Sequence, residues 1–400
     1  MGAAWPRLDI DTSIVGLIRG YACRNRGSNF YVLFISSFEF PSPAPTEGAA
    51  RCAVALMFRR VFGRRDISIP LYNATGRYFA ACAAIRGGAH VTSMGKTLAI
   101  VNPAARNGDG ARGAAFLRYA AGSAAAPFEG IQIETTREAG HATALAAQAS
   151  NFDCVLAVGG DGVVHETLAG LMRIPREKRP AFALIPCGNG NDYARTLGMS
   201  FVMEEALTQL SSAQRISADV GVCNGEYFAE TLSFGLDAAI ALGTYERRRR
   251  TGREGTRLFV EEGANQLVFH RDAYDFTAIA DGGTSKQGSM HLFAVQVGPT
   301  YGGGFRVCPN ADATDGKLNC CVAKAPLGML KAAYLFARAK DGKHVGHTGS
   351  FDFFDAKSLT LEFDREPPAQ IDGEPIHGTK FDIAVLPGAL DVYFAKGAAH

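Results

Sequence analysis

One short stretch constrains the fold more than any other: residues 158–170 read VGGDGVVHETLAG. The stretch follows the apolar run FDCVLA and leads into a helical pattern, so it predicts a buried strand, a tight turn and a helix. A helix that begins at the carboxyl end of a parallel strand offers unpaired N–H groups to anions. Gly159, Gly160 and Gly162 let the backbone approach such an anion closely. The stretch therefore indicates a phosphate-binding turn, with glycines that serve packing alone as the alternative.

Strand-like and helical runs alternate around this stretch, from Met94 to about residue 215. Expected strands carry the runs TLAIV, GIQIETT, FDCVLAV and PAFALIP, and expected helices carry ARGAAFLRYAA, HATALAAQAS, ETLAGLMRI and NDYARTLG. This alternation is typical of an α/β domain with a mostly parallel sheet covered by helices on both faces. We predict such a domain over residues 94–218.

The pattern changes near residue 219, where short strand-like runs separated by Gly, Asp and Pro take over. Asn224 and Gly225 stand between two such runs, which is a strong hairpin signal. We predict a mainly β, sandwich-like domain over residues 219–375, with helices near residues 254–269 and 327–340. We also expect the last strand, within residues 376–400, to return to the first domain.

Two further polar loops follow strands of the predicted parallel sheet. Asn102 ends the first strand, and the segment PCGNGNDYARTLG, with Gly188, Asn189 and Asn191, follows the fourth. Carboxyl ends of parallel strands meet at one edge of a sheet. We therefore expect these loops to converge on the glycine turn, although Asn191 and Asp192 could simply cap a helix.

Residues 1–93 lack sustained periodicity and contain the segment PSPAPTEG and clusters of arginine. We interpret them as a poorly ordered or accessory extension. A start of the native polypeptide at Met94 is the alternative.

Charge and cysteine content exclude some classes of protein. The formal net charge is only +2, from 41 basic and 39 acidic residues, which gives no global field for nucleic acid. Nine dispersed cysteines without zinc-ligand spacing indicate reduced thiols in a cytoplasmic protein. We find no apolar stretch of the roughly 20 residues that a membrane-spanning helix needs.

Six segments together resemble the diacylglycerol kinase catalytic-domain family, which includes bacterial lipid kinases, sphingosine kinases and ceramide kinases and shares its fold with NAD kinases. The resemblance runs from about residue 96 to the C-terminus. It is carried, in order, by NPAARNG, VGGDGVVHETLAGL, IPCGNGNDYARTLG, DVGVCNGEYFAETLSFGLDAAI, YGGGFRVCPNADATDGKL and QIDGEPI. It implies an NAD-kinase-like fold and phosphoryl transfer from ATP with Mg²⁺ to the hydroxyl of diacylglycerol or a similar lipid.

The resemblance also implies roles for individual residues. Nucleotide-binding positions would be Asn102, Gly159, Gly160, Asp161, Gly162, Glu166, Gly188, Asn189 and Asn191. Glu374 would be the general base, supported by Asp372 and by Asp237 on the substrate side. Asp161 and Glu166 would supply acidic character to magnesium or position the nucleotide, while Glu166 could alternatively stabilise a helix N-terminus. A second metal position would lie at Asp312, Asp315 and Lys317, where a plain Asp-Gly turn is the alternative.

Two departures from the family pattern keep other functions open. Val163 replaces the usual threonine, and Asn189 stands where threonine is common. A sphingoid-base kinase, an NAD kinase and a nucleotide-binding module without turnover are the alternatives. A homodimer is also left open.

The segment YERRRRTGREGTR places six arginines within residues 247–257. Such a run is usually a solvated helix face. Since a lipid kinase without an anchor must reach the bilayer, we also expect this run to dock the enzyme peripherally on an anionic membrane.

Overall fold

The computed structural model describes residues 18–24, 31–38, 71–73, 78–80, 93–121, 126–253, 256–269 and 272–395. The chain divides into two compact units, Met1–His90 and Val91–His400. In the first unit, the strands β1 (Ile18–Arg24), β2 (Tyr31–Phe38), β4 (Tyr78–Ala80) and β3 (Leu71–Asn73) pair antiparallel in that order. The segment PSPAPTEG and the arginine clusters of residues 59–65 lie outside the described residues.

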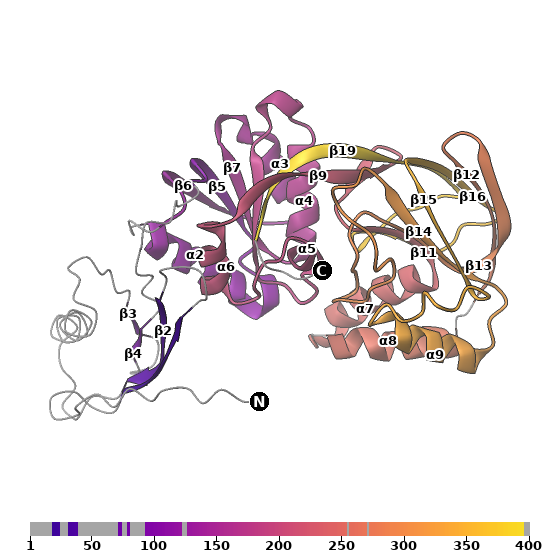
Figure 1. Cartoon of the computed structure of the whole chain (residues 1–400), viewed down its shortest axis with the longest axis horizontal. Helices are drawn as coiled ribbons and strands as arrows, with labels where there is room; N and C mark the ends of the chain where they lie inside the picture. Colours follow the sequence, from indigo (N-terminus) through magenta and orange to yellow (C-terminus); the bar gives the residue numbers. More distant parts are fainter. Residues whose placement is uncertain are drawn as a thin grey trace. The chain divides into compact units, whose positions relative to one another are not determined.

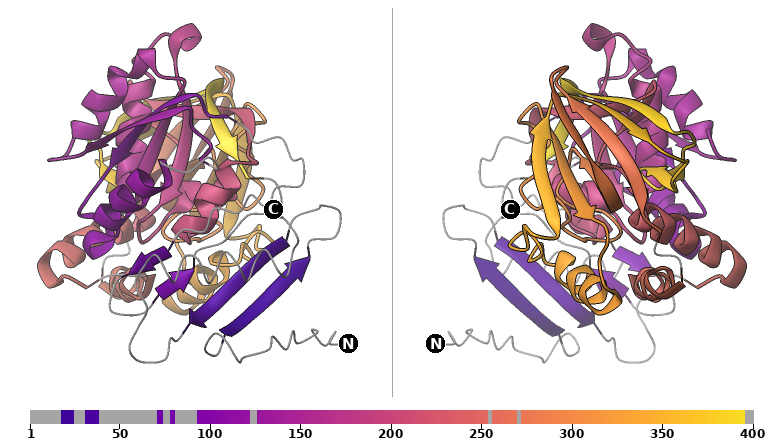
Figure 2. Two further views of the ribbon diagram at one scale, coloured as in Figure 1. Left: turned by 90° about the vertical axis from the view of Figure 1, so that its left-hand side faces the viewer. Right: turned by 90° about the vertical axis from the view of Figure 1, so that its right-hand side faces the viewer.

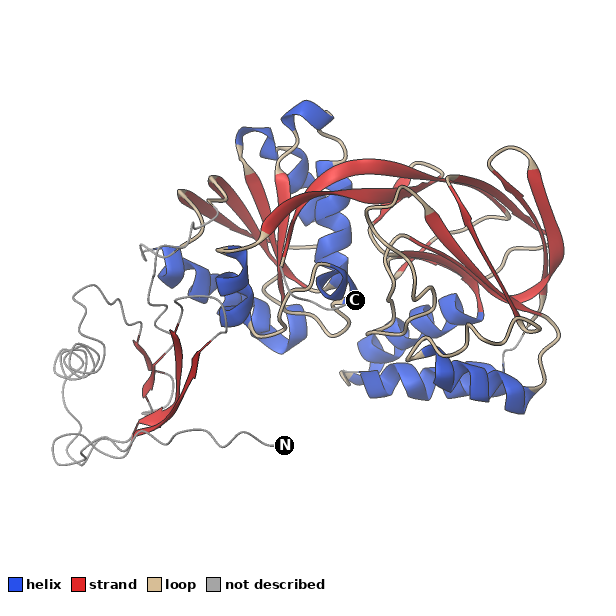
Figure 3. Ribbon diagram, in the orientation of Figure 1, coloured by secondary structure: helices blue, strands red, loops and turns tan. Residues whose placement is uncertain are grey.

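The first half of the second unit is the predicted α/β domain. Its parallel strands lie in the order β8 (Ala181–Pro186), β7 (Cys154–Gly159), β5 (Lys96–Val101) and β6 (Gly130–Thr135). The helices are α2 (Asp109–Ala121), α3 (His141–Ala147), α4 (Asp161–Leu171), α5 (Asp192–Thr196) and α6 (Met203–Leu210). Every residue of β7 and β8 is buried, as expected for parallel strands with both faces covered. Figure 3 shows helices around these strands.

The second half is mainly β, with three helices gathered together (Figure 1). Its strands are β9 (Gln214–Cys223), β10 (Glu226–Phe228), β11 (Thr231–Gly235), β12 (Tyr274–Ala280), β13 (Thr284–Gln296), β14 (Leu318–Lys324), β15 (Phe351–Ala356), β16 (Ser358–Phe363), β17 (Ala369–Ile371), β18 (Glu374–Pro375) and β19 (Lys380–Phe394). The helices are α7 (Leu236–Thr251), α8 (Thr256–Phe269) and α9 (Met329–Ala339). The predicted fold class, an α/β domain followed by a sandwich-like β domain, is confirmed.

One long strand joins the two halves into a continuous sheet. β19 pairs antiparallel with β16 at its start and with β9 along most of its length, and reaches β8 through the parallel pair Val392 and Phe182. It arches over both halves in Figure 1, and the side views of Figure 2 show the halves on opposite faces of this unit.

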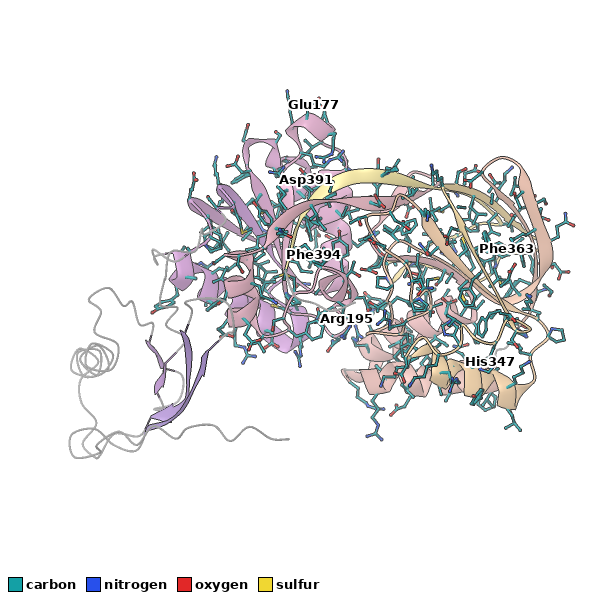
Figure 4. The ribbon with its side chains drawn as sticks, viewed as in Figure 1. Glu177, Arg195, His347, Phe363, Asp391 and Phe394 are labelled. Carbon is teal, nitrogen blue, oxygen red and sulfur yellow. The ribbon has the colours of Figure 1, made fainter. Side chains whose placement is uncertain are left out.

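Charge pairs hold the far end of β19. Asp391 accepts hydrogen bonds from Arg176, from Arg215 at 2.7 Å and from Ser217 at 2.8 Å (Figure 4). Burial alone would raise the pKa of Asp391, but these partners lower it to about 2. The end of β19 is therefore fixed to the α/β half by ion pairs between a half-buried carboxylate and exposed arginines.

The hairpin and the two helices that the sequence predicts in the second half are present in the structure. Asn224 and Gly225 form the predicted hairpin between β9 and β10, both with positive φ, at 50° and 91°. Helices α8 and α9 lie where helices were predicted. No separate helix was predicted at α7, which begins directly after Gly235 and carries the first four arginines of the run, Arg247 to Arg250, in its last turns. Among the described residues, no helix is long and apolar enough to cross a bilayer.

Candidate active site

Three loops meet at the carboxyl edge of the parallel strands, as the sequence predicts. Val101 lies beside Val158, and Gly159 lies beside Pro186, so β5, β7 and β8 end at the same level. The N–H of Asn102 donates to the carbonyl of Val158 at 3.1 Å, and the N–H of Cys187 donates to that of Gly159 at 2.8 Å. The strand register therefore brings the loops after β5, β7 and β8 side by side.

Two glycines allow the loops after β7 and β8 to touch. A Cβ on Gly188 would lie 2.3 Å from the Cα of Gly160, and a Cβ on Gly160 would lie 2.9 Å from the Cα of Gly188. Both contacts are with backbone, which cannot move aside cheaply. A Cβ on Gly162 would meet nothing within 4 Å. Gly160 and Gly188 are therefore needed for close packing, while Gly162, in the first turn of α4, is exposed.

Asp161 links the same two loops. Its carboxylate accepts the N–H groups of Asn191 and Asp192, each at 2.8 Å, and so caps the start of α5 from the start of α4. A Cβ on Gly190 would lie 2.5 Å from this carboxylate. Burial raises the pKa of Asp161. The two backbone hydrogen bonds act in the opposite direction but do not cancel this effect. Asp161 is half-buried.

The side chains of several residues predicted to bind the nucleotide make hydrogen bonds to the backbone of the loops or of a neighbouring helix. Asn191, in the left-handed region with φ 54°, closes its own loop: its side chain accepts from the N–H of Gly188 and donates to the carbonyl of Gly188. Asn102 accepts from the N–H of Ala104 at 3.0 Å. Glu166 accepts from the N–H of Ala142 at 3.0 Å and thereby caps α3. The half-buried Asn189 lies in the loop that Asn191 closes.

A fourth loop, which the sequence did not connect to the others, is held by Asp192. The buried carboxylate of Asp192 accepts the N–H groups of Gly303 and Gly304, each at 2.8 Å. Gly302, Gly303 and Gly304 all have positive φ, which only glycine adopts in succession. Burial, with Asp161 nearby, raises the pKa of Asp192 to about 7. Arg195 lies beside this junction and against Gly304 (Figure 4).

The C-terminal turn reaches the same region. Asp372, with φ 48°, accepts the N–H groups of Ala229, Glu230 and Thr231 at 2.7 to 3.0 Å. Its Oδ2 lies 3.4 Å from Nδ1 of His165, on α4. Burial alone would lower the pKa of His165, but Asp372, Glu374 and Glu226 raise it. Glu374 is exposed and follows Asp372 by two residues, so the contact of Asp372 with His165 ties the segment that carries Glu374 to α4.

Glu230 is a buried carboxyl that sequence reasoning missed. It is 5% exposed, and neither of its oxygens has a hydrogen-bond partner among the described residues. Burial raises its pKa well above the ordinary value, and Asp192, Asp372 and Asp161 act in the same direction. No local pattern distinguished it from any other acidic residue in a strand-like run.

Asp237, which was expected to support Glu374 on the substrate side, lines an apolar cavity. Asp237 is 3% exposed and accepts a hydrogen bond from the hydroxyl of Tyr301 at 2.8 Å. Its other oxygen, Oδ1, has no hydrogen-bond partner in the described chain. The cavity lies between α7, α8, α9 and the strands β13 and β14. Apart from Asp237, Tyr301, His291 and His344, its lining is apolar.

One chain of contacts connects the glycine turn with this cavity. Asp161 binds the N–H of Asp192, and the Asp192 carboxylate binds the loop of Gly303 and Gly304. The same loop begins at Tyr301, which donates to Asp237 in the cavity wall. Contacts between segments about 110 residues apart thus hold the two regions in fixed relation.

The second predicted metal position does not have the arrangement of a cation cage. Asp312 accepts from the N–H and hydroxyl of Thr314, and Asp315 accepts from the N–H of Lys317. The ammonium of Lys317, which cannot ligate a cation, lies 3.6 Å from Asp315 and 3.9 Å from Asp355. Across the described residues, no group of three His, Cys, Asp or Glu side chains could hold a metal ion. These contacts fit the alternative, an Asp-Gly turn.

Comparison with known proteins agrees with this geometry. Residues 96–223 match the diacylglycerol kinase catalytic domain, and residues 230–394 match the YegS C-terminal NAD kinase beta sandwich-like domain. The chain belongs to the diacylglycerol kinase catalytic-domain family. The two matches together run from β5 to β19, apart from residues 224–229, and cover all four loops and the C-terminal turn.

Curated relatives of this family include two proteins named "Probable lipid kinase YegS-like". The protein from Chromohalobacter salexigens is 28% identical over 67% of this chain and 85% of its own length. That from Pseudomonas aeruginosa is 27% identical over 67% of this chain and 86% of its own length. A solved structure titled a "putative diacylglycerol kinase" from Bacillus anthracis has 25% identity and a TM-score of 0.62, covering 79% of this chain and all of that one.

Proposed function

We propose that the chain is an ATP-dependent lipid kinase that phosphorylates the hydroxyl of diacylglycerol or a similar lipid, giving phosphatidic acid from diacylglycerol. The observation that carries this proposal is the apolar cavity walled by Asp237 and connected through Tyr301 and Asp192 to the glycine turn. An acyl chain suits the cavity because its lining is almost entirely apolar. A dinucleotide acceptor, with its charged phosphates, does not suit it.

The nucleotide would lie at the edge formed by the loops after β5, β7 and β8. The first turn of α4 directs backbone N–H groups to this edge, and Gly162 leaves the approach open. Asp161 would face a magnesium ion carried on the triphosphate, which neutralises phosphate charge during transfer. Asn191, Glu166 and Asn102 would act by holding the loops in shape.

Glu374 would take the proton of the acceptor hydroxyl. The oxygen of that hydroxyl would bond to the γ-phosphorus while the bond from the γ-phosphorus to the bridging oxygen of the β-phosphate breaks, and ADP would leave. Asp372 supports this role because its three backbone hydrogen bonds fix the turn that carries Glu374. A sphingoid base is the second candidate acceptor, since the unpartnered oxygen of Asp237 suits an ammonium group.

The test is incubation of the full chain with radiolabelled ATP, Mg²⁺ and one acceptor at a time, followed by thin-layer separation of lipids. Diacylglycerol, sphingosine and NAD are the acceptors. Labelled phosphatidic acid is the expected product. Label in the sphingosine product alone would reassign the acceptor, label in NADP alone would contradict a lipid kinase, and nucleotide binding without any labelled product would indicate a module without turnover.

A further inference from the structure

The two most exposed large apolar side chains among the described residues lie at one end of the pair formed by α8 and α9. Phe269, the last residue of α8, is 72% exposed, and Leu330, in the first turn of α9, is 82% exposed. Val268 and Met329 beside them are about half exposed. We call these four residues the apolar tip. Isolated exposed apolar side chains are ordinary, whereas a cluster of them marks an interaction surface.

A buried histidine holds the two halves of the apolar tip together. Nδ1 of His291 lies 2.9 Å from the carbonyl of Asp272, which follows α8, and Nε2 accepts the N–H of Leu327, which precedes α9, at 3.1 Å. Further along the pair, a Cβ on Gly263 would lie 2.6 Å from the ring of Phe336. The end of α8 and the start of α9 are thus neighbours, as Figure 1 shows for the helices themselves.

Basic side chains accompany the apolar tip on α9. The helix contains Lys331 and Arg338 and no acidic residue. The guanidinium of Arg338 lies over the ring of Tyr334, which is 51% exposed one turn after Leu330. An apolar end flanked by cations fits the interface of an anionic bilayer, where apolar side chains enter the acyl boundary and cations contact phosphates.

The inner faces of the same helices line the apolar cavity. Leu267, Ala332 and Leu335 face the cavity, while Phe269 and Leu330 are exposed on the same elements. We propose that the apolar tip inserts into the interface of an anionic bilayer and places the cavity next to the membrane from which it takes a lipid. The class of lipid substrate rests on the proposed function, whereas insertion of the tip does not.

The arginine run lies at the other end of α8 and is partly neutralised. Arg247 contacts Glu262 at 2.6 Å, and Arg253 and Arg257 contact Glu261 at 2.8 and 3.2 Å. The pair of Arg247 and Glu262 binds α7 to α8, and all three pairs reduce the charge available for a membrane. The run is therefore the weaker docking surface of the two.

A second copy of the chain is the other occupant to consider. A stable dimer buries about 800 Å² on each partner, and four partly exposed side chains offer only on the order of a few hundred Å². Insertion into a bilayer requires no contact area beyond these four side chains, so the bilayer is the partner that the apolar tip fits.

The test is sedimentation of the full chain with vesicles of phosphatidylcholine alone or with 30% phosphatidylglycerol. The double variant F269S/L330S is compared with I279T, which changes an apolar residue of β12 that is 41% exposed. We expect the double variant to bind anionic vesicles at least about tenfold more weakly, because the insertion of each apolar side chain raises the binding affinity by a factor of about ten or more. Nucleotide binding and turnover of a short-chain, water-soluble diacylglycerol should stay unchanged.

Three outcomes would overturn the apolar tip as a membrane surface: unchanged vesicle binding in F269S/L330S, an equal loss in I279T, or a change from dimer to monomer in F269S/L330S with no vesicle binding by the unmodified chain. The triple variant R248A/R249A/R250A adds a further comparison, since a larger loss there than in the double variant would assign docking to the arginine run. Tip-dependent vesicle binding without phosphorylation of any lipid would support the tip and contradict the proposed function.

Discussion

The loops at the sheet edge and the apolar cavity are built in different ways. The loops depend on glycine and on short-range hydrogen bonds, as when Asn191 closes its own loop onto Gly188. The cavity draws its lining from α7, α8, α9, β13 and β14, which are spread over more than one hundred residues, and depends on apolar packing. We therefore expect a single added carbon atom in the loops at the sheet edge to destabilise the protein. In the cavity, we expect acceptor binding to change gradually as the volume of the lining side chains changes. Four predictions test this difference.

The largest effect is expected at Glu374, the proposed general base. In Glu374→Gln, we expect kcat on lipid to fall by about 10²- to 10⁴-fold, because a general base contributes that much. Nucleotide affinity and thermal stability should not change, since Glu374 is exposed. Glu366→Gln, at an exposed carboxylate paired with His377, is the control. Near-normal turnover by the Glu374 variant would reject its assignment as the base.

The sensitivity of the edge is tested by alanine at two of its glycines. Gly188→Ala places a Cβ against the backbone of Gly160, so we expect a loss of about 1–3 kcal/mol in the free energy of unfolding. Gly162→Ala meets open space and should leave stability almost unchanged. Chemical denaturation of both variants measures the difference. Equal stability of the two variants would show that the loops can separate without cost.

The gradual response of the cavity is tested by filling it. Ala332→Leu adds volume to the lining, so we expect KM for a long-chain acceptor to rise about tenfold while a short-chain acceptor is affected less. Ala333→Leu makes the same change on the exposed side of α9. Steady-state kinetics with both acceptors compares the variants. A rise in KM that does not depend on chain length would place the acyl chain elsewhere.

The smallest effect concerns the only carboxyl in the cavity lining. Burial raises the pKa of Asp237 to about 6 from its ordinary 3.8, although the hydroxyl of Tyr301 lowers it in part. The folded protein therefore keeps a proton that the unfolded chain has lost, and stability falls as the pH rises from about 4 to 6. Asp237→Asn should remove part of this fall, on the order of 1 kcal/mol, in denaturation curves measured across that range. An unchanged pH dependence would mean that Asp237 is ionised at little cost.

Sequence patterns predicted the parts of the molecule that depend on neighbouring residues. Alternating strands and helices gave the α/β half, and Asn224-Gly225 gave the hairpin, because both follow from local backbone preference. The convergence of three loops followed from the rule for parallel strands. The fold class was therefore accessible before any coordinates.

The connections between loops were not accessible in the same way. Asp192 binds Gly303 and Gly304 from more than one hundred residues away, and His165 meets Asp372 across 207 residues. Hydrogen bonds between residues so far apart in the sequence produce no periodic pattern in it. For the same reason, Glu230 was not distinguished, and Lys317 was assigned to a metal position although its ammonium neutralises Asp315. The nucleotide and catalytic roles remain predictions that the variants above test.

The path of β19 bears on the order in which the chain matures. Arg179, in the segment before β8, donates to the carbonyl of Ala389 in β19, 210 residues further along. During synthesis, β8 emerges long before the strand that covers it, and its edge stays unpaired until β19 arrives. The α/β half consequently cannot complete its sheet as an independent early module, and its final shape waits for nearly all of the second half to leave the ribosome.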